Sequence, residues 1–113
     1  MARSRIESHR QRGFELKVNR ADVMHLIYQG LKNGCAYCGC ELEMGEHVDG
    51  QAPPDNMITL EVIDPTRRVL DETNIKMVCD RCNRIKGSMN LDDFYWQCRL
   101  IADNLEGMMM GGK

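Results

Sequence analysis

Long apolar runs are absent from this 113-residue chain, and aromatic residues are few: two Phe, three Tyr and one Trp. No stretch approaches the roughly 18 consecutive apolar residues of a membrane-spanning helix. The opening MARSRIESHR also lacks the apolar segment of a secretory leader. The sequence therefore argues against a membrane-embedded protein. It predicts one domain with a modest core in a reducing, intracellular location.

The formal net charge is only −2, but the charges are unevenly distributed. Residues 1–20 carry six Lys or Arg against two acids, and residues 65–90 carry six against three. Between them, residues 21–64 hold eight acids and a single Lys or Arg, Lys32. This separation predicts a polarised surface with basic regions suited to a polyanion.

The first basic region, residues 1–18, has no clear apolar periodicity. We expect it to form an N-terminal arm in which Arg10 and Arg12 contact nucleic-acid phosphates. A frayed terminus or a solvated helix fits the same composition equally well.

Four of the six cysteines form two pairs with the spacing of a metal knuckle. Cys35 and Cys38 form one Cys-x-x-Cys pair, and Cys79 and Cys82 form the other. Together they can supply four thiolates to one tetrahedral structural zinc. Cys40 is close enough to compete, but the spacing favours the two pairs. Redox or disulfide use stays open, although a reducing location favours thiolates on zinc.

The 40 residues between the two knuckles contain hard oxygen donors. Glu61, Asp64 and Asn74 lie there, and Asn83 directly follows the second knuckle. Carboxylate and amide oxygens suit Mg²⁺ or Mn²⁺ better than zinc. The sequence thus predicts a soft structural site beside a hard candidate site.

Periodicity and capping residues predict an α+β fold. The expected elements are a helix over 20–32 capped by Asn19, strands over 57–63 and 74–78, a helix over 80–89, and a closing helix capped by Asn90. We expect one domain over 19–106 and a disordered tail over 107–113. The closing helix is expected to bury its apolar side chains in the core, namely Leu91, Phe94, Tyr95, Cys98, Ile101 and Leu105.

Residues 35–94 resemble the HNH endonuclease superfamily, whose ββα-metal fold often carries a four-Cys zinc site. The resemblance is carried by Glu61-Val62-Ile63-Asp64-Pro65, then Asn74, then Cys79-Asp80-Arg81-Cys82-Asn83-Arg84-Ile85-Lys86. It implies a ββα-metal core flanked by an N-terminal and a C-terminal helix. It also implies that Glu61 and Asn83 hold a catalytic Mg²⁺ or Mn²⁺ and that Asn74 braces the catalytic loop. Phosphates of duplex DNA would be contacted by Arg67, Arg68, Arg84 and Lys86.

The chain departs from this family at the general base, because Val62 stands where the family has His. Some small phage-type relatives have Arg there. A valine cannot accept a proton, and general-base assistance contributes roughly 10²–10⁴-fold to a rate. His47, His9 and Asp64 are candidate substitutes.

Two functions follow from the resemblance. The first is an HNH-like, metal-dependent DNA endonuclease in the cytoplasm of a bacterial or phage-infected cell, slow or degenerate at its active site. The second is a catalytically inactive HNH-like zinc module that binds DNA or a protein. Val62 favours the second. A third reading is that Val62 was introduced to disable an enzyme for study. The register of Glu61, Asn74 and Asn83 favours the first.

Overall fold

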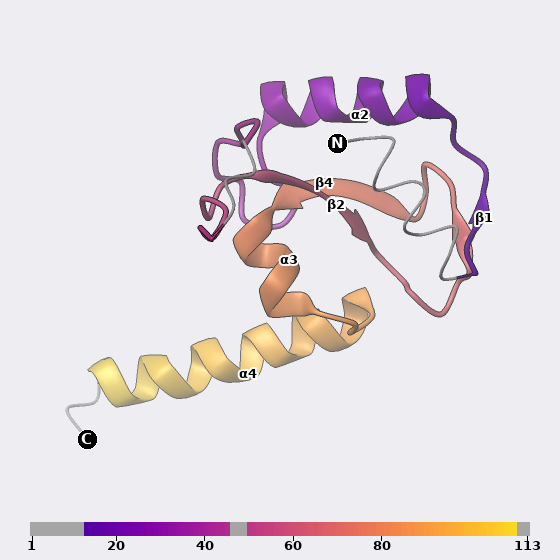
Figure 1. Ribbon diagram of the computed structural model, residues 1–113. Helices are drawn as coiled ribbons and strands as arrows, with labels where there is room; N and C mark the ends of the chain where they lie inside the picture. The colour runs from indigo at the N-terminus through magenta and orange to yellow at the C-terminus, as the bar shows by residue number, and fades with distance from the viewer. Residues whose placement is uncertain (1–12, 46–49, 111–113) are drawn as a thin grey trace.

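The computed structural model describes residues 13–45 and 50–110. Within them the fold is α+β, as predicted, with three helices and two small sheets (Figure 1). The elements in chain order are β1 (Glu15–Leu16), α2 (Arg20–Asn33), β2 (Ile58–Val62), β3 (Val69–Leu70), β4 (Ile75–Cys79), α3 (Asp80–Lys86) and α4 (Leu91–Met110).

Helix α2 begins where its capping residues predict. The Asn19 side chain accepts a hydrogen bond from the Asp22 amide at 2.8 Å, and the Asp22 carboxylate accepts one from the Asn19 amide at 2.9 Å. Val23, Ile27 and Gly30 form the buried face. A Cβ on Gly30 would lie 2.9 Å from the Met77 Cβ. The missing side chain therefore lets α2 pack closely on the sheet.

Strands β2 and β4 form an antiparallel pair whose register runs from Ile58 opposite Cys79 to Val62 opposite Ile75. Every residue of β2 is buried, because α2 and α3 both pack against this pair. The chain passes directly from Cys79 into α3, which ends before Gly87. The two predicted strands and the helix after the second are present, with the short strand β3 between the two in the chain.

The predicted boundary of the N-terminal arm is wrong for its last residues. Strand β1 pairs in parallel with β3, and Phe14 and Val18 on either side of it are buried in the core. Two isolated apolar anchors produce no periodic pattern, so no pattern in the sequence indicated this pairing. Arg10 and Arg12 lie outside the described residues.

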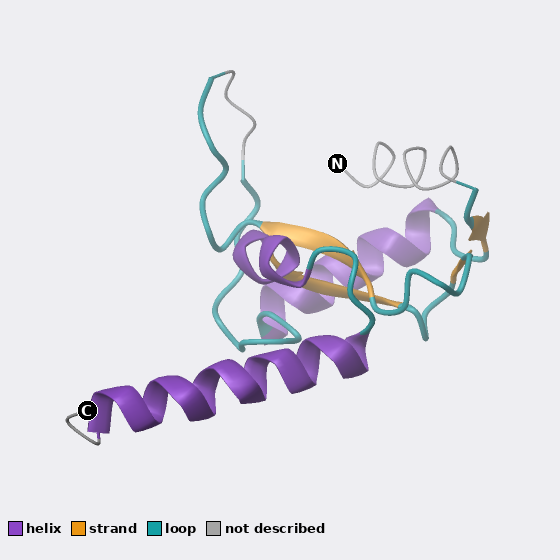
Figure 2. Ribbon diagram, turned by 90° about the horizontal axis from the view of Figure 1, so that it is seen from below, coloured by secondary structure: helices purple, strands orange, loops and turns teal. Residues whose placement is uncertain are grey.

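The prediction for the closing helix is also corrected. Asn90 caps it as expected, accepting a hydrogen bond from the Asp93 amide at 2.9 Å. Of its apolar side chains only Phe94 is buried, against Tyr37, with ring centroids 5.6 Å apart. The rest of α4 runs past the body of the molecule (Figures 1 and 2).

Helix α4 continues to Met110, so residues 107–110 are helical and do not belong to a disordered tail. The exposed side chains that were expected in the core are Leu91, Tyr95, Cys98, Ile101 and Leu105. Among the described helices, none combines the length and apolar composition that crossing a bilayer requires.

Candidate metal centre and the buried Glu61 site

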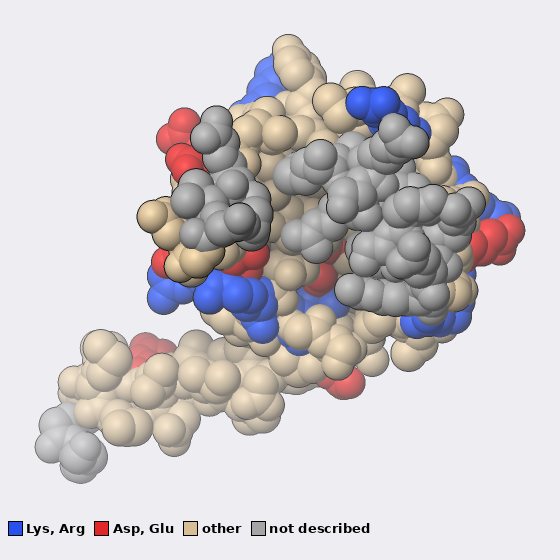
Figure 3. Space-filling view, in the orientation of Figure 1, with Lys and Arg blue, Asp and Glu red and all other residues tan. Residues whose placement is uncertain are grey.

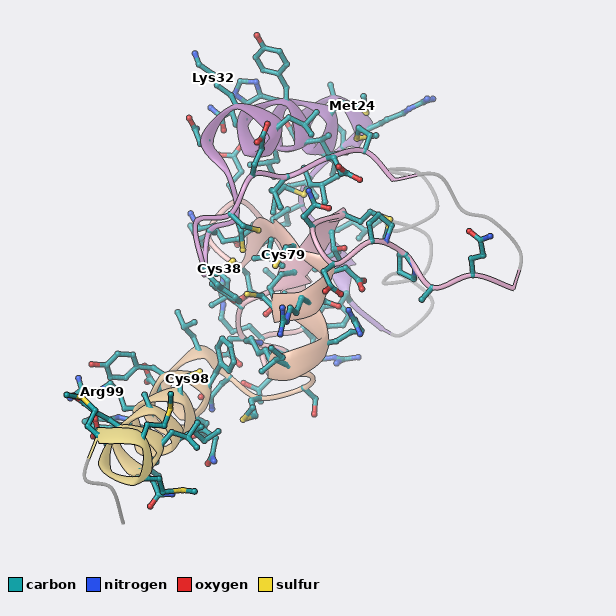
Figure 4. All side chains as sticks on the ribbon, turned by 90° about the vertical axis from the view of Figure 1, so that its left-hand side faces the viewer. Met24, Lys32, Cys38, Cys79, Cys98 and Arg99 are labelled. Atoms are coloured by element: carbon teal, nitrogen blue, oxygen red, sulfur yellow. The ribbon has the colours of Figure 1, made fainter. Side chains whose placement is uncertain are left out.

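Four cysteines from three parts of the fold come together. Their sulfur atoms, from Cys35, Cys38, Cys79 and Cys82, all lie within 4.8 Å of one another. The first two sit in the turn after α2, Cys79 ends β4, and Cys82 lies in the first turn of α3. Cys38 and Cys79 approach each other in Figure 4, with sulfur atoms 3.8 Å apart. These four cysteines can hold a metal ion, as their spacing predicts.

Backbone amides point at these sulfur atoms. The Cys35 sulfur accepts N–H bonds from Tyr37 and Cys38 at 3.4 Å and from Cys79 at 3.3 Å. The Cys79 sulfur accepts one from Cys82 at 3.3 Å, which also caps α3. Hydrogen bonds from amides stabilise the charged form of an acceptor. The cluster is therefore arranged to favour thiolates.

The thiols differ in proton affinity. A backbone hydrogen bond from Cys40 lowers the pKa of Cys38 to about 6. Burial raises the pKa of Cys40 to about 12 and raises that of Cys82 well above its ordinary value. Metal binding requires deprotonated sulfur, so loading the cluster releases protons.

A second group of polar side chains surrounds Glu61, which is 3% exposed. Its Oε1 accepts a hydrogen bond from the Asn83 amide nitrogen at 3.1 Å. Its Oε2 accepts one from the Tyr37 hydroxyl at 3.0 Å and lies 2.9 Å from the Lys86 ammonium. The two predicted ligands, Glu61 and Asn83, are thus adjacent, but protein donors already occupy both carboxylate oxygens.

Lys86 completes this buried group. Its side chain is 0% exposed, and Nζ also donates to the Val62 carbonyl at 3.1 Å. A phosphate cannot reach this ammonium, so the prediction that Lys86 contacts DNA is wrong. The reason is that α3 packs against β2 and directs this side chain inward. Val62 belongs to the apolar core.

Tyr37 was not anticipated as part of the site. Its position between Cys35 and Cys38 gives no signal beyond the knuckle itself. Burial, followed by the negative charge of Glu61, raises the pKa of the Tyr37 hydroxyl above its ordinary value. The phenol therefore stays protonated and serves as a donor to Glu61.

The donors present do not fit Mg²⁺ or Mn²⁺. Glu61 already has an ammonium partner, and Asn83 turns its amide nitrogen toward it. The Asp64 carboxylate accepts from the Thr66 amide at 2.9 Å and hydroxyl at 2.6 Å, which lowers its pKa. A hard divalent ion needs several free oxygen ligands. Both Glu61 oxygens already have protein donors and Asn83 presents its nitrogen to Glu61, so the two predicted ligands do not form an open oxygen site.

Asn74 lies where the resemblance places a bracing residue. It is 1% exposed, and its side chain accepts from the Asp64 amide at 2.9 Å and donates to the Val69 carbonyl at 2.9 Å. It thereby holds the loop between β2 and β3. Its part in catalysis stays a prediction.

Two of the predicted DNA-contacting arginines, Arg67 and Arg84, are exposed but already have acidic partners. Arg84 contacts Asp80 at 2.7 Å and Asp55 at 2.9 Å, and Arg67 contacts Asp71 at 3.1 Å. Figure 3 shows basic and acidic side chains interspersed on this face.

Arg68 lies over the Phe14 ring at 4.1 Å. Arg81, which the sequence did not single out, is 68% exposed and lies 3.9 Å from Asp55. Of the substitute bases, Asp64 is held by Thr66. His9 and His47 lie outside the described residues.

Comparison with known proteins finds no family model, no curated protein and no solved structure that matches this chain.

Proposed function

We propose that this chain is an HNH-like module that binds one structural zinc and duplex DNA and does not cleave the DNA. The observation that carries this proposal is the buried Lys86–Glu61 ion pair at 2.9 Å. An ammonium neutralises the one carboxylate that the family resemblance assigns to the catalytic ion. Since Val62 is no base, both halves of the hydrolytic machinery are missing.

Zinc is the metal that best suits the cysteine cluster. Four thiolates with no open position are typical of structural zinc sites, and soft sulfur ligands disfavour Mg²⁺ and Mn²⁺. The ion would join the turn after α2 to the start of α3. Its contribution is to folding, since the closed ligand set leaves no position for a substrate.

Binding to DNA is supported by the exposed arginines of α3 and of the loop before β3. Arg81, Arg84 and Arg67 have side chains that are 68%, 58% and 45% exposed. Exposed ion pairs contribute only about 0–1 kcal/mol. Phosphates can therefore replace the aspartates at little cost, which gives binding with little sequence preference.

A salt titration of duplex binding tests this proposal. The zinc-loaded chain should bind a labelled duplex with an affinity that falls steeply as salt rises. Arg81→Ala should flatten the logarithmic slope by about one, as expected for one lost phosphate contact. Arg99→Ala, on α4, is the matched control and should leave the slope unchanged. No binding at low salt would exclude the DNA-binding role.

A metal-dependent endonuclease remains the second candidate. It is favoured by the contact between Glu61 and Asn83 at 3.1 Å, which brings together the two residues that the resemblance assigns to the ion. Cleavage would require the ion to displace Lys86 from Glu61. A plasmid-nicking assay distinguishes the two candidates, because only the endonuclease would cleave.

A further inference from the structure

Six apolar residues of α4 follow the spacing of a coiled-coil seam. They recur at alternating intervals of three and four, at Leu91, Phe94, Cys98, Ile101, Leu105 and Met108. Other apolar residues, such as Trp96 and Leu100, lie off this series. Alternation of this kind is the spacing of a helix–helix seam. The seam is therefore suited to another helix.

Only the start of this seam is covered within the chain. Phe94 packs on Tyr37, but Ile101, Leu105 and Met108 are 48%, 43% and 58% exposed. The positions flanking the seam carry no charge, and the charged residues lie on the opposite side of the helix, at Asp92, Asp93, Arg99, Asp103 and Glu106. In Figure 3 the projecting part of α4 presents mainly uncharged surface. No like charges would therefore oppose pairing of two such helices.

A groove of about 570 Å³ lies at the base of α4. The body lines it with Tyr37, Ile63 and Lys76, and α4 lines it with Leu91, Asp92 and Cys98 among others. The last turn of α4 carries no basic residue to balance the partial negative charge of its carbonyl end. Lys76 places a positive charge where another helix could end.

We propose that two copies of this chain pair through α4 in an antiparallel arrangement, each helix ending in the groove of the other copy. When the two seams are matched, Leu91 of one copy lies opposite Met108 of the second copy. In the same way Phe94 lies opposite Leu105, and Cys98 lies opposite Ile101. Each layer then occurs twice, and the two-fold symmetry closes the assembly.

Measuring the mass of the full, zinc-loaded chain over a concentration series tests this pairing. We expect twice the 13.0 kDa mass of the chain. Ile101→Asp places a charge in the seam and should give single chains. The neighbouring Leu100→Asp is the matched control, because Leu100 is 64% exposed and lies off the seam; this variant should stay dimeric.

Single chains at every concentration would overturn the proposal, as would equal effects of the two aspartates or a larger assembly. A single-chain species that pairs only with a different protein would overturn it as well. Disulfide mapping checks the direction: Ile101→Cys should cross-link to Cys98 of the second copy. Cross-linking of Cys98 to Cys98 would indicate a parallel pair and contradict the arrangement.

Discussion

Lys86 and Glu61 form an ion pair at 2.9 Å in which both side chains are almost fully withdrawn from solvent, at 0% and 4% exposure. Two charges removed from water in this way depend on each other, because either one alone would remain buried and uncompensated. The stability of the fold therefore depends on both residues being present.

Lys86→Met should destabilise the chain by about 3–5 kcal/mol, since Glu61 is left without its ammonium partner. Urea denaturation measures the loss. Lys32→Met is the control, because Lys32 is exposed in the last turn of α2, and its change should stay within about 0.5 kcal/mol. Adding Glu61→Gln to Lys86→Met should recover part of the loss. Equal effects of Lys86→Met and Lys32→Met would contradict the importance of the pair.

The unmodified chain should not nick supercoiled plasmid with Mg²⁺ or Mn²⁺. Val62→His alone should not restore cleavage either, because Lys86 still occupies Glu61. Val62→His combined with Lys86→Ala removes both obstacles and is the variant in which nicking is expected, provided that it folds. If the unmodified chain nicks plasmid and Glu61→Ala abolishes the nicking, the proposed non-cleaving function is wrong and the endonuclease function is supported.

Cys79→Ser should release the metal and lower the melting temperature sharply, since Cys79 belongs to the cysteine cluster, is buried and caps α3. Cys98→Ser should retain one zinc per chain, because Cys98 lies on α4, away from the cluster (Figure 4). Metal analysis and thermal melting give both results. A zinc content that Cys79→Ser leaves unchanged would exclude this cluster.

Tyr37 predicts a dependence of stability on alkaline pH. Its folded-state pKa is raised above the ordinary 10.0, so the folded state holds the phenolic proton more tightly than the unfolded state does. The stability from this proton is complete below about pH 10 and is lost as the pH rises above that value. Tyr37→Phe should be less affected by alkali. Unfolding curves from pH 8 to 11 compare the two, and parallel profiles would contradict the assignment.

The sequence predicted those features that depend on local chemistry. Asn19 and Asp22 cap α2 through their own backbone amides, and the two Cys-x-x-Cys spacings define the cluster. It did not predict that Lys86 is buried, because lysine almost never lies fully inside unless it is paired. Its partner Glu61 is 25 residues away, and the pairing arises from the packing of α3 on β2.

The sequence also could not predict which part of α4 is covered by the rest of the chain. A regular apolar face predicts that something covers a helix, but it does not say whether that is the same chain. The short pairing of β1 with β3 was missed for a related reason, since two-residue strands have no period to detect.

Cys79 ends β4, caps α3 and takes part in the cluster with Cys35, which precedes it by 44 residues. A metal bound at this point joins the hairpin, the helix and the knuckle after α2. Free zinc would then be a component of the folding equilibrium: above the dissociation constant, each tenfold fall in its concentration removes about 1.4 kcal/mol of stability. The amount of folded protein in a cell would thus follow its zinc supply.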